Sequence, residues 1–115
     1  PLALEAAASP DTELRDTGTR AIGKLAETVP PERIPEALRL ELVERLRANL
    51  ASTNAVIRAK AVRSFGKLAR FGHLSAAERE TFRGVCQSLL GRDDRFDWDR
   101  AYVVRREAEE ALRYL

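Results

Sequence analysis

The segment that decides the fold, residues 57–69, reads Ile57-Arg58-Ala59-Lys60-Ala61-Val62-Arg63-Ser64-Phe65-Gly66-Lys67-Leu68-Ala69. Its pattern also occurs 43 residues earlier, over residues 14–26, where the closing Gly-Lys-Leu-Ala is unchanged. A third copy begins at residue 104, 47 residues after the second. Self-similarity with a period in the forties is typical of proteins built from stacked helical hairpins. The sequence therefore predicts a repeat protein.

Apolar or small residues recur within each copy at intervals of 4, 3, 1 and 3 residues, which is one face of an α-helix. The second of these positions is always Gly or Ala, which predicts close approach of a neighbouring helix. The five positions in the three copies are Leu14, Gly18, Ala21, Ile22, Leu25; Ile57, Ala61, Ser64, Phe65, Leu68; and Val104, Ala108, Ala111, Leu112, Leu115.

Signals for helix starts accompany these faces. A small polar residue stands six positions before each repeat arginine, and we expect these residues to be N-caps: Ser9, Ser52 and Asp99. Two further helices are predicted between the copies, over residues 35–50 and 76–90. The second opens with a capping box, Ser75 to Glu78. Nothing in the sequence alternates as a strand would.

The stretch from Ala55 to Leu68 resembles a HEAT repeat: a cap, then an aliphatic residue and Arg, then small residues, then a Gly-Lys-Leu ending. The resemblance covers nearly the whole chain, although Arg113 stands where the earlier copies have Gly. It implies an all-α fold, an α-α superhelix of about two and a half HEAT-like hairpins, with units of about 1–29, 30–72 and 73–115. It also implies a scaffold that binds other proteins or, in some members, nucleic acid. We expect the chain to be part of a longer protein.

The amino-acid composition indicates which class of protein this chain belongs to. The chain has 115 residues, 44% hydrophobic and 33% charged, with a formal net charge of +2. This balance favours a folded, helix-rich domain over a disordered one. The only cysteine, Cys86, cannot form an intramolecular disulfide, which fits the cytoplasm. We expect no cofactor, no metal site and no membrane-spanning segment.

Six cations form what we call the basic stripe: Arg20, Lys24, Lys60, Arg63, Lys67 and Arg70. Those of the second copy share one side of a helical wheel. Three interpretations remain open: ion pairs within the protein, an acidic protein or peptide partner, or nucleic acid. In the third copy, Glu107 and Glu110 occupy the positions of Lys60 and Arg63. We expect these acids to pair with the stripe across the gap between stacked helices.

Two other features have both a structural and a binding interpretation. The repeat arginines Arg15, Arg58 and Arg105 either tie neighbouring units together or form a binding ladder, and the HEAT resemblance implies the first. In the loop of residues 91–100, Phe96 and Trp98 are either interface residues or a hydrophobic staple that closes the core. The acids of this loop lack the Gly and closing Glu of a calcium-binding loop.

Catalysis finds no support in the sequence. His73 is the only histidine, and Cys86 lies on the apolar side of its helix. Phosphate-binding Gly-rich loops and Cys/His metal clusters are absent. A HEAT-fold enzyme resembling the alkylpurine DNA glycosylases is the least favoured hypothesis. The sequence therefore predicts a non-catalytic module for protein–protein interaction, with nucleic-acid binding as the alternative. The incomplete first unit further predicts self-association or packing against the rest of a longer chain.

Overall fold

The computed structural model describes all 115 residues and contains only helices, which confirms the all-α class. Six α-helices and one 3-10 turn follow one another along the chain. Their bounds are α1 (Leu2–Ala7), α2 (Thr12–Thr28), η1 (Pro31–Arg33), α3 (Glu36–Leu50), α4 (Ala55–Arg70), α5 (Ala76–Leu89) and α6 (Tyr102–Leu112). No helix combines the length with the apolar character that a membrane crossing would need.

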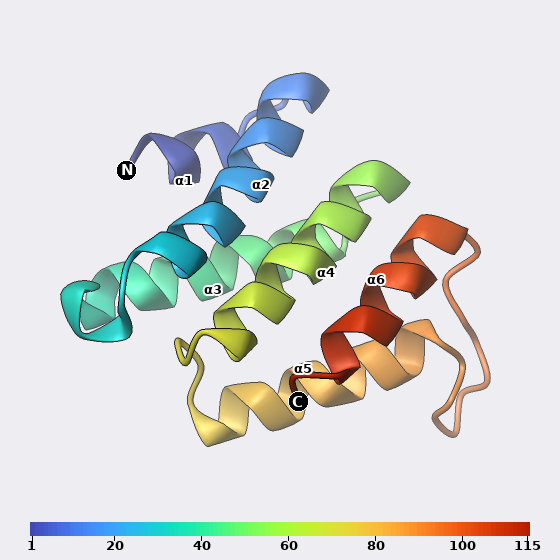
Figure 1. Cartoon of the computed structure of the whole chain (residues 1–115). Helices are drawn as coiled ribbons and strands as arrows, with labels where there is room; N and C mark the ends of the chain where they lie inside the picture. Colours follow the sequence, from blue (N-terminus) through green and yellow to red (C-terminus); the bar gives the residue numbers. More distant parts are fainter.

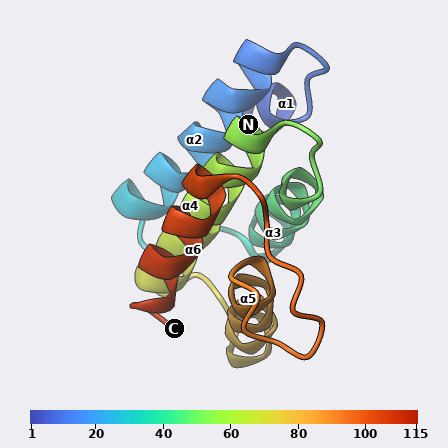
Figure 2. The same ribbon diagram turned by 90° about the vertical axis from the view of Figure 1, so that its right-hand side faces the viewer.

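The helices form two layers. The three helices that carry the repeated pattern, α2, α4 and α6, lie side by side in one layer (Figure 1). Figure 2 shows α1, α3 and α5 on the other side of this layer. The molecule measures 38 × 33 × 18 Å, and its shortest dimension is that of two packed helices. One broad side of the molecule is therefore made by α2, α4 and α6 alone.

The apolar face predicted for α4 is correct at all five positions, and Ile57, Phe65 and Leu68 are buried with Ala61 and Ser64. Phe65 stacks on Phe82 of α5 with 4.4 Å between ring centroids. Cys86 is also buried, and loss of solvent raises the pKa of its thiol to about 12. Leu14 departs from the prediction, since it is 49% exposed.

The predicted N-caps are two residues too early. Asp11 caps α2 by accepting from the Leu14 amide at 2.9 Å, and Asn54 caps α4 by accepting from the amides of Val56 and Ile57. The residues predicted as caps instead form a turn just before each helix, in which the side-chain oxygen accepts from the amide two positions later. This turn occurs three times, at Ser9, Ser52 and Asp99.

Two of the three repeat arginines hold these turns in place. Arg58 donates to the carbonyl oxygen of Ser52 at 3.0 Å, and Arg105 donates to that of Asp99 at 2.7 Å. Arg58 also forms two hydrogen bonds with the Asp99 carboxylate, at 2.8 and 3.1 Å, so it connects α4 to the segment before α6. Arg15 bonds Asn49 instead. The structural interpretation of these arginines agrees with their contacts.

Asn49 of α3 is a fully buried polar group with partners on two other helices, α1 and α2. Its amide nitrogen donates to the Ala7 carbonyl oxygen at 3.0 Å and to the Thr19 hydroxyl at 2.8 Å, and its oxygen accepts from Arg15. Every polar atom of its side chain is therefore satisfied, as burial requires. Asn49 fixes α1, α2 and α3 relative to one another.

Glycines permit the closest contacts between helices. A Cβ at Gly18 would lie 2.3 Å from the Ala7 nitrogen, and one at Gly23 would lie 2.7 Å from the Ser64 hydroxyl oxygen. At Gly66 the corresponding distance to the Ala111 Cβ is 3.1 Å. These positions bring α1 against α2, α2 against α4, and α4 against α6. Side chains here would push the helices apart.

Two Gly→Ala substitutions test this close packing. Gly18→Ala should lower the free energy of unfolding by about 1–3 kcal/mol, because the added methyl overlaps the backbone of α1. Gly84→Ala, at an exposed position of α5 with no atom within 4 Å of the added Cβ, should raise it by about 0.5–1 kcal/mol. Urea unfolding followed by circular dichroism measures both. Equal effects would show that α1 does not rest on α2 at Gly18.

A second prediction concerns Asp99. Burial alone would raise the pKa of its carboxylate, but hydrogen bonds from Arg58 and the Ala101 amide and the charge of Arg105 together lower it below its ordinary value. A lowered pKa in the folded state means that the carboxylate stabilises the protein above about pH 4, and that this stability is lost as the pH falls through the folded pKa.

Asp99→Asn should therefore be less stable than the wild type at pH 7, and the difference should shrink below about pH 4. Urea unfolding between pH 3 and 7 measures it. Asp94→Asn is the control in the same loop, where the carboxylate forms no hydrogen bond or ion pair, and it should change stability little. A difference for Asp99→Asn that stays constant with pH would exclude this role of its charge.

Candidate partner-binding surface

The basic stripe lies on the broad side of the molecule made by α2, α4 and α6. Arg20 and Lys24 come from α2, and the other four cations come from α4. Because the two helices repeat in register, Arg20 and Arg63 occupy equivalent positions on adjacent helices, as do Lys24 and Lys67. The structure therefore brings all six predicted cations onto one surface, which also has two hollows.

The smaller hollow, of about 210 Å³, lies between α2 and α4, and we call it the α2–α4 hollow. Ser64 lies at its base, with the hydroxyl donating to the Thr19 carbonyl oxygen at 2.7 Å. Its other six lining residues are all charged, five of them positively: Arg20, Lys24, Glu27, Lys60, Arg63 and Lys67.

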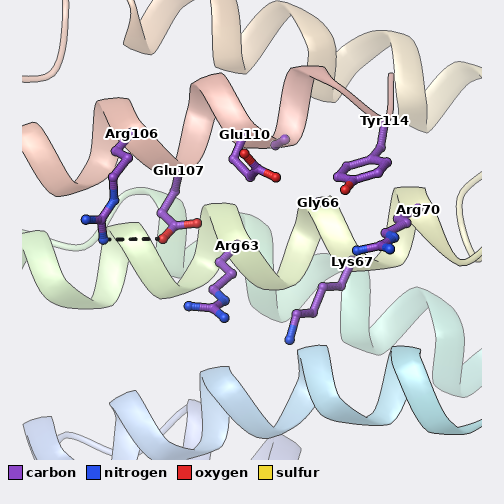
Figure 3. A pocket seen from close by; sticks show the side chains of 9 residues that line it. Arg63, Gly66, Lys67, Arg70, Arg106, Glu107, Glu110 and Tyr114 are labelled. Carbon is purple, nitrogen blue, oxygen red and sulfur yellow. Dashed lines mark ion pairs between the residues drawn. The ribbon is translucent and has the colours of Figure 1, made fainter.

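The larger hollow, of about 420 Å³, lies between α4 and α6, and we call it the α4–α6 hollow (Figure 3). Gly66 and Ala111 are its small residues, and charged side chains form most of the rest. The remaining lining residues are Arg63, Lys67, Arg70, Arg106, Glu107, Glu110 and Tyr114. Arg63 and Lys67 line both hollows, so the two hollows share the ridge of α4.

The ion pairs of the stripe differ from those predicted. Lys60 pairs with Asp16 at 3.3 Å, and Lys67 pairs with Glu27 at 2.5 Å, so both lysines reach toward α2. The hydrogen bond from Lys67, together with the charges of Lys67 and Lys24, lowers the pKa of the Glu27 carboxylate against the opposing effect of desolvation.

The expected pairing of the stripe with Glu107 and Glu110 is wrong. Glu107 pairs with Arg106 of α6 at 3.9 Å, and Glu110 pairs at 3.4 Å with Arg113, the residue that follows α6. The physical reason is the direction of the α4 side chains. Figure 3 shows Arg63 and Lys67 pointing away from α6, toward α2. The acids of α6 therefore remain at the surface of the α4–α6 hollow.

Three arginines of the stripe, Arg20, Arg63 and Arg70, are exposed and have no carboxylate within 4.0 Å and no side-chain hydrogen bond. Arg70 is nevertheless held in place, because its guanidinium lies 5.1 Å from the ring centre of Phe71 and 4.7 Å from that of Tyr114. Stacking uses the faces of a guanidinium and leaves its in-plane N–H donors free. Arg70 is therefore positioned to donate to a carboxylate or phosphate.

The two aromatic residues predicted for binding lie elsewhere, in the loop between α5 and α6. Phe96 is 74% exposed and has a positive φ of 51°, so it does not close the core. Trp98 covers Gly91, and Arg100 stacks on its ring at 4.6 Å. Neither residue lines either hollow.

Arg106 and Tyr114 line the α4–α6 hollow and were missed from the sequence. A signal for Tyr114 existed, since it lies 47 residues after Lys67 and so occupies the equivalent position in the third copy, just beyond the end of α6. Arg106 is equivalent to Ala59, which is buried, so no such comparison would have identified it.

In comparisons with known proteins, no family model, no curated protein and no solved structure matches this chain. Its function must therefore be inferred from its own residues and their geometry.

The partners of Lys60 can be tested with a double-mutant cycle. Lys60→Gln and Asp16→Asn should show a coupling energy of about 0.2–1 kcal/mol, which is usual for a partly exposed ion pair. Lys60→Gln with Glu107→Gln should show a smaller coupling, because those two side chains are not paired. The free energy of unfolding in urea at low salt measures both cycles. A larger coupling to Glu107 would restore the pairing predicted from the sequence.

Proposed function

We propose that this chain is a non-catalytic HEAT-like scaffold that binds an acidic segment of a partner protein on the broad side formed by α2, α4 and α6. The residues we assign to binding are the basic stripe, with Arg63 and Arg70 as the principal anchors. Phe96 and Trp98 are proposed as a separate, secondary contact.

The arrangement of the helices supports the HEAT-like part of the proposal. The three repeat-bearing helices pack side by side through their small residues, whereas α3 packs mainly on α4, and α5 mainly on α6. The repeated turn and arginine described above give the second and third units the same entry into their second helices. We propose units of about 1–29, 30–72 and 73–115 that stack into a short superhelix.

The observation that carries the binding proposal is that Arg20, Arg63 and Arg70 share one surface without partners. Arginine is enriched among the residues that dominate binding energy at interfaces, and its planar fork suits carboxylates. Arg70 is fixed between two rings, so less conformational entropy is lost when a ligand binds. Lysines that already have acidic partners, Lys60 and Lys67, would contribute less.

A protein segment fits this surface better than nucleic acid. Duplex DNA carries about one negative charge per 1.7 Å along its axis, so it favours an unbroken run of cations. Here Asp16 and Glu27 already neutralise two lysines, and Glu107 and Glu110 line the adjacent hollow. An acidic segment of a protein can place its few carboxylates against the arginines alone. Nucleic acid remains the second candidate, favoured by the five cations around the α2–α4 hollow.

The proposed compartment is the cytoplasm. The buried Cys86 thiol is compatible with a reducing environment. Its pKa is raised to about 12, so little of it is present as the thiolate that a nucleophile requires. His73 is buried, and its Nε2 bonds the Ala26 carbonyl oxygen at 2.9 Å, which favours a structural role.

Fluorescence anisotropy with two labelled probes tests the function: a glutamate-rich peptide of about 15 residues and a duplex DNA of about 15 base pairs. The peptide should bind more tightly than the DNA at about 150 mM salt. Arg63→Gln with Arg70→Gln should weaken peptide binding by about tenfold or more, since each removes an anchor.

The matched control is Arg33→Gln with Arg47→Gln, which removes two exposed arginines that line neither hollow, one from η1 and one from α3, and should leave the affinity unchanged. Tight DNA binding, with a logarithm of affinity that falls by about 0.9 per phosphate contact with the logarithm of salt, would instead support the nucleic-acid function. Absence of binding to either probe would contradict both functions.

A further inference from the structure

The α2–α4 hollow contains two arginines that have no partner within the protein. Arg20 lines it from α2 and Arg63 from α4, and neither forms an ion pair or a side-chain hydrogen bond. Figure 3 shows Arg63 pointing from α4 toward α2, the side on which this hollow lies. A single group that fills the hollow therefore meets arginine side chains from both helices.

The three lysines that line the hollow differ from these arginines, because each has a carboxylate within 4.0 Å. Only two carboxylates serve all three lysines, so the five cations of the hollow keep an excess of three positive charges. An anion that enters the hollow therefore meets charge that the acids of the protein leave unbalanced. The pairs are Lys60 with Asp16, Lys24 with Glu27, and Lys67 with Glu27.

The size and lining of the hollow favour a small, fully polar group. Its volume of about 210 Å³ is below the roughly 300–1,000 Å³ that is usual for sites of larger organic ligands. Ser64 is its only uncharged lining residue, and the hydroxyl already donates to the Thr19 carbonyl oxygen. An aromatic ring or a nucleobase would find no apolar side chain to pack on. The lining therefore suits an anionic group on a short side chain.

We propose that the α2–α4 hollow is a phosphate-binding site for a phosphoserine or phosphothreonine residue within the acidic segment of the partner protein. The phosphate group binds Arg20 and Arg63, and the lysines around it add positive charge. The inference rests on the proposed function, because it specifies which residue of the acidic segment this part of the surface selects. The remaining acids of the segment are left for Arg70, which lies outside this hollow.

Two arginines from different helices suit a phosphate better than a carboxylate. A carboxylate has two oxygens and one negative charge, and the fork of a single guanidinium occupies both oxygens. A phosphorylated side chain at neutral pH has three acceptor oxygens and a charge of about −1.5 to −2. It therefore accepts hydrogen bonds from both arginines and balances more of the excess charge in the hollow.

The phosphates of a nucleic acid fit this arrangement less well. Each phosphodiester carries one negative charge, and such groups follow one another closely along the whole ligand, so they require cationic sites that continue across the surface. In the third copy, however, the positions of Lys60 and Arg63 hold Glu107 and Glu110. The arrangement of the α2–α4 hollow is therefore not repeated on α6, and a single phosphorylated residue matches it better.

The experiment compares two versions of the glutamate-rich peptide described above, which differ only at the central residue, glutamate or phosphoserine. By fluorescence anisotropy, the phosphoserine peptide should bind on the order of tenfold more tightly, because it adds charge-assisted hydrogen bonds to the second arginine. In ¹⁵N NMR spectra, the two complexes should differ at the amide of Ser64, which lines the α2–α4 hollow. They should agree at Ala111, which lines only the α4–α6 hollow.

Arg20→Gln should remove most of the preference for phosphoserine. Arg20 is exposed and has no partner, so the variant should fold like the wild type, which circular dichroism checks. Arg70→Gln provides the comparison: it removes the same charge from the same surface but outside the hollow. It should weaken both peptides by the same factor and leave the ratio of their affinities unchanged.

Equal affinities of the two peptides for the wild type would overturn the inference and leave the proposed function intact, as would a preference that Arg20→Gln does not alter. Inorganic phosphate is the competitor that identifies the source of the phosphate. If it displaces the phosphoserine peptide at concentrations close to the Kd of that peptide, the hollow is a site for free phosphate and the inference is wrong.

Two further outcomes concern both proposals. Tighter binding of the duplex DNA than of the phosphoserine peptide would overturn the inference in favour of nucleic acid. Absence of binding by both peptides would contradict the inference and the proposed function together.

Discussion

Gly23 and Gly66 allow three parallel helices to approach more closely than side chains would permit, and the charged surface made by α2, α4 and α6 depends on that approach. Ser64 bonds the Thr19 carbonyl oxygen across the first contact, and Ala111 fills the second. The outward side chains of α2, α4 and α6 are therefore neighbours across each helix pair. If larger residues separated these helices, charged residues of adjacent helices would no longer line the same hollow.

Like charges placed close together repel each other, and acidic side chains neutralise only some cations of the basic stripe. Asp16 and Glu27 neutralise lysines of the stripe, whereas Arg20, Arg63 and Arg70 have no acidic partner. Lysine is a compact, strongly hydrated charge, and arginine is a planar donor that also stacks on aromatic rings. The cations without an acidic partner are thus the ones best able to form directional bonds with a carboxylate, while the paired lysines connect α4 to α2.

The sequence was a good guide to the helices and a poorer one to their side-chain partners. The buried face of α4 and the capping box at Ser75 followed from spacing alone, because helical periodicity and local hydrogen bonds lie within a few residues. The caps of α2 and α4 lie two residues later than predicted because Ser and Asp or Asn stand two residues apart, and either can accept from a backbone amide.

The six cations of the candidate surface were identified from the repeat. Their ion pairs were not, because the rotation of α4 about its axis decides whether Lys60 meets Asp16 or Glu107, and three-dimensional packing sets that rotation.

The buried position of Cys86 makes this residue an internal reporter of molecular motion. A thiol reagent added to the native protein cannot react while α5 rests on its neighbours, and the raised pKa keeps the sulfur protonated. Modification therefore requires transient opening of that helix, so its rate records how often the second layer separates from the first. With no other cysteine in the chain, the signal comes from a single site, and ligand binding on the far layer could be followed through its effect on that opening.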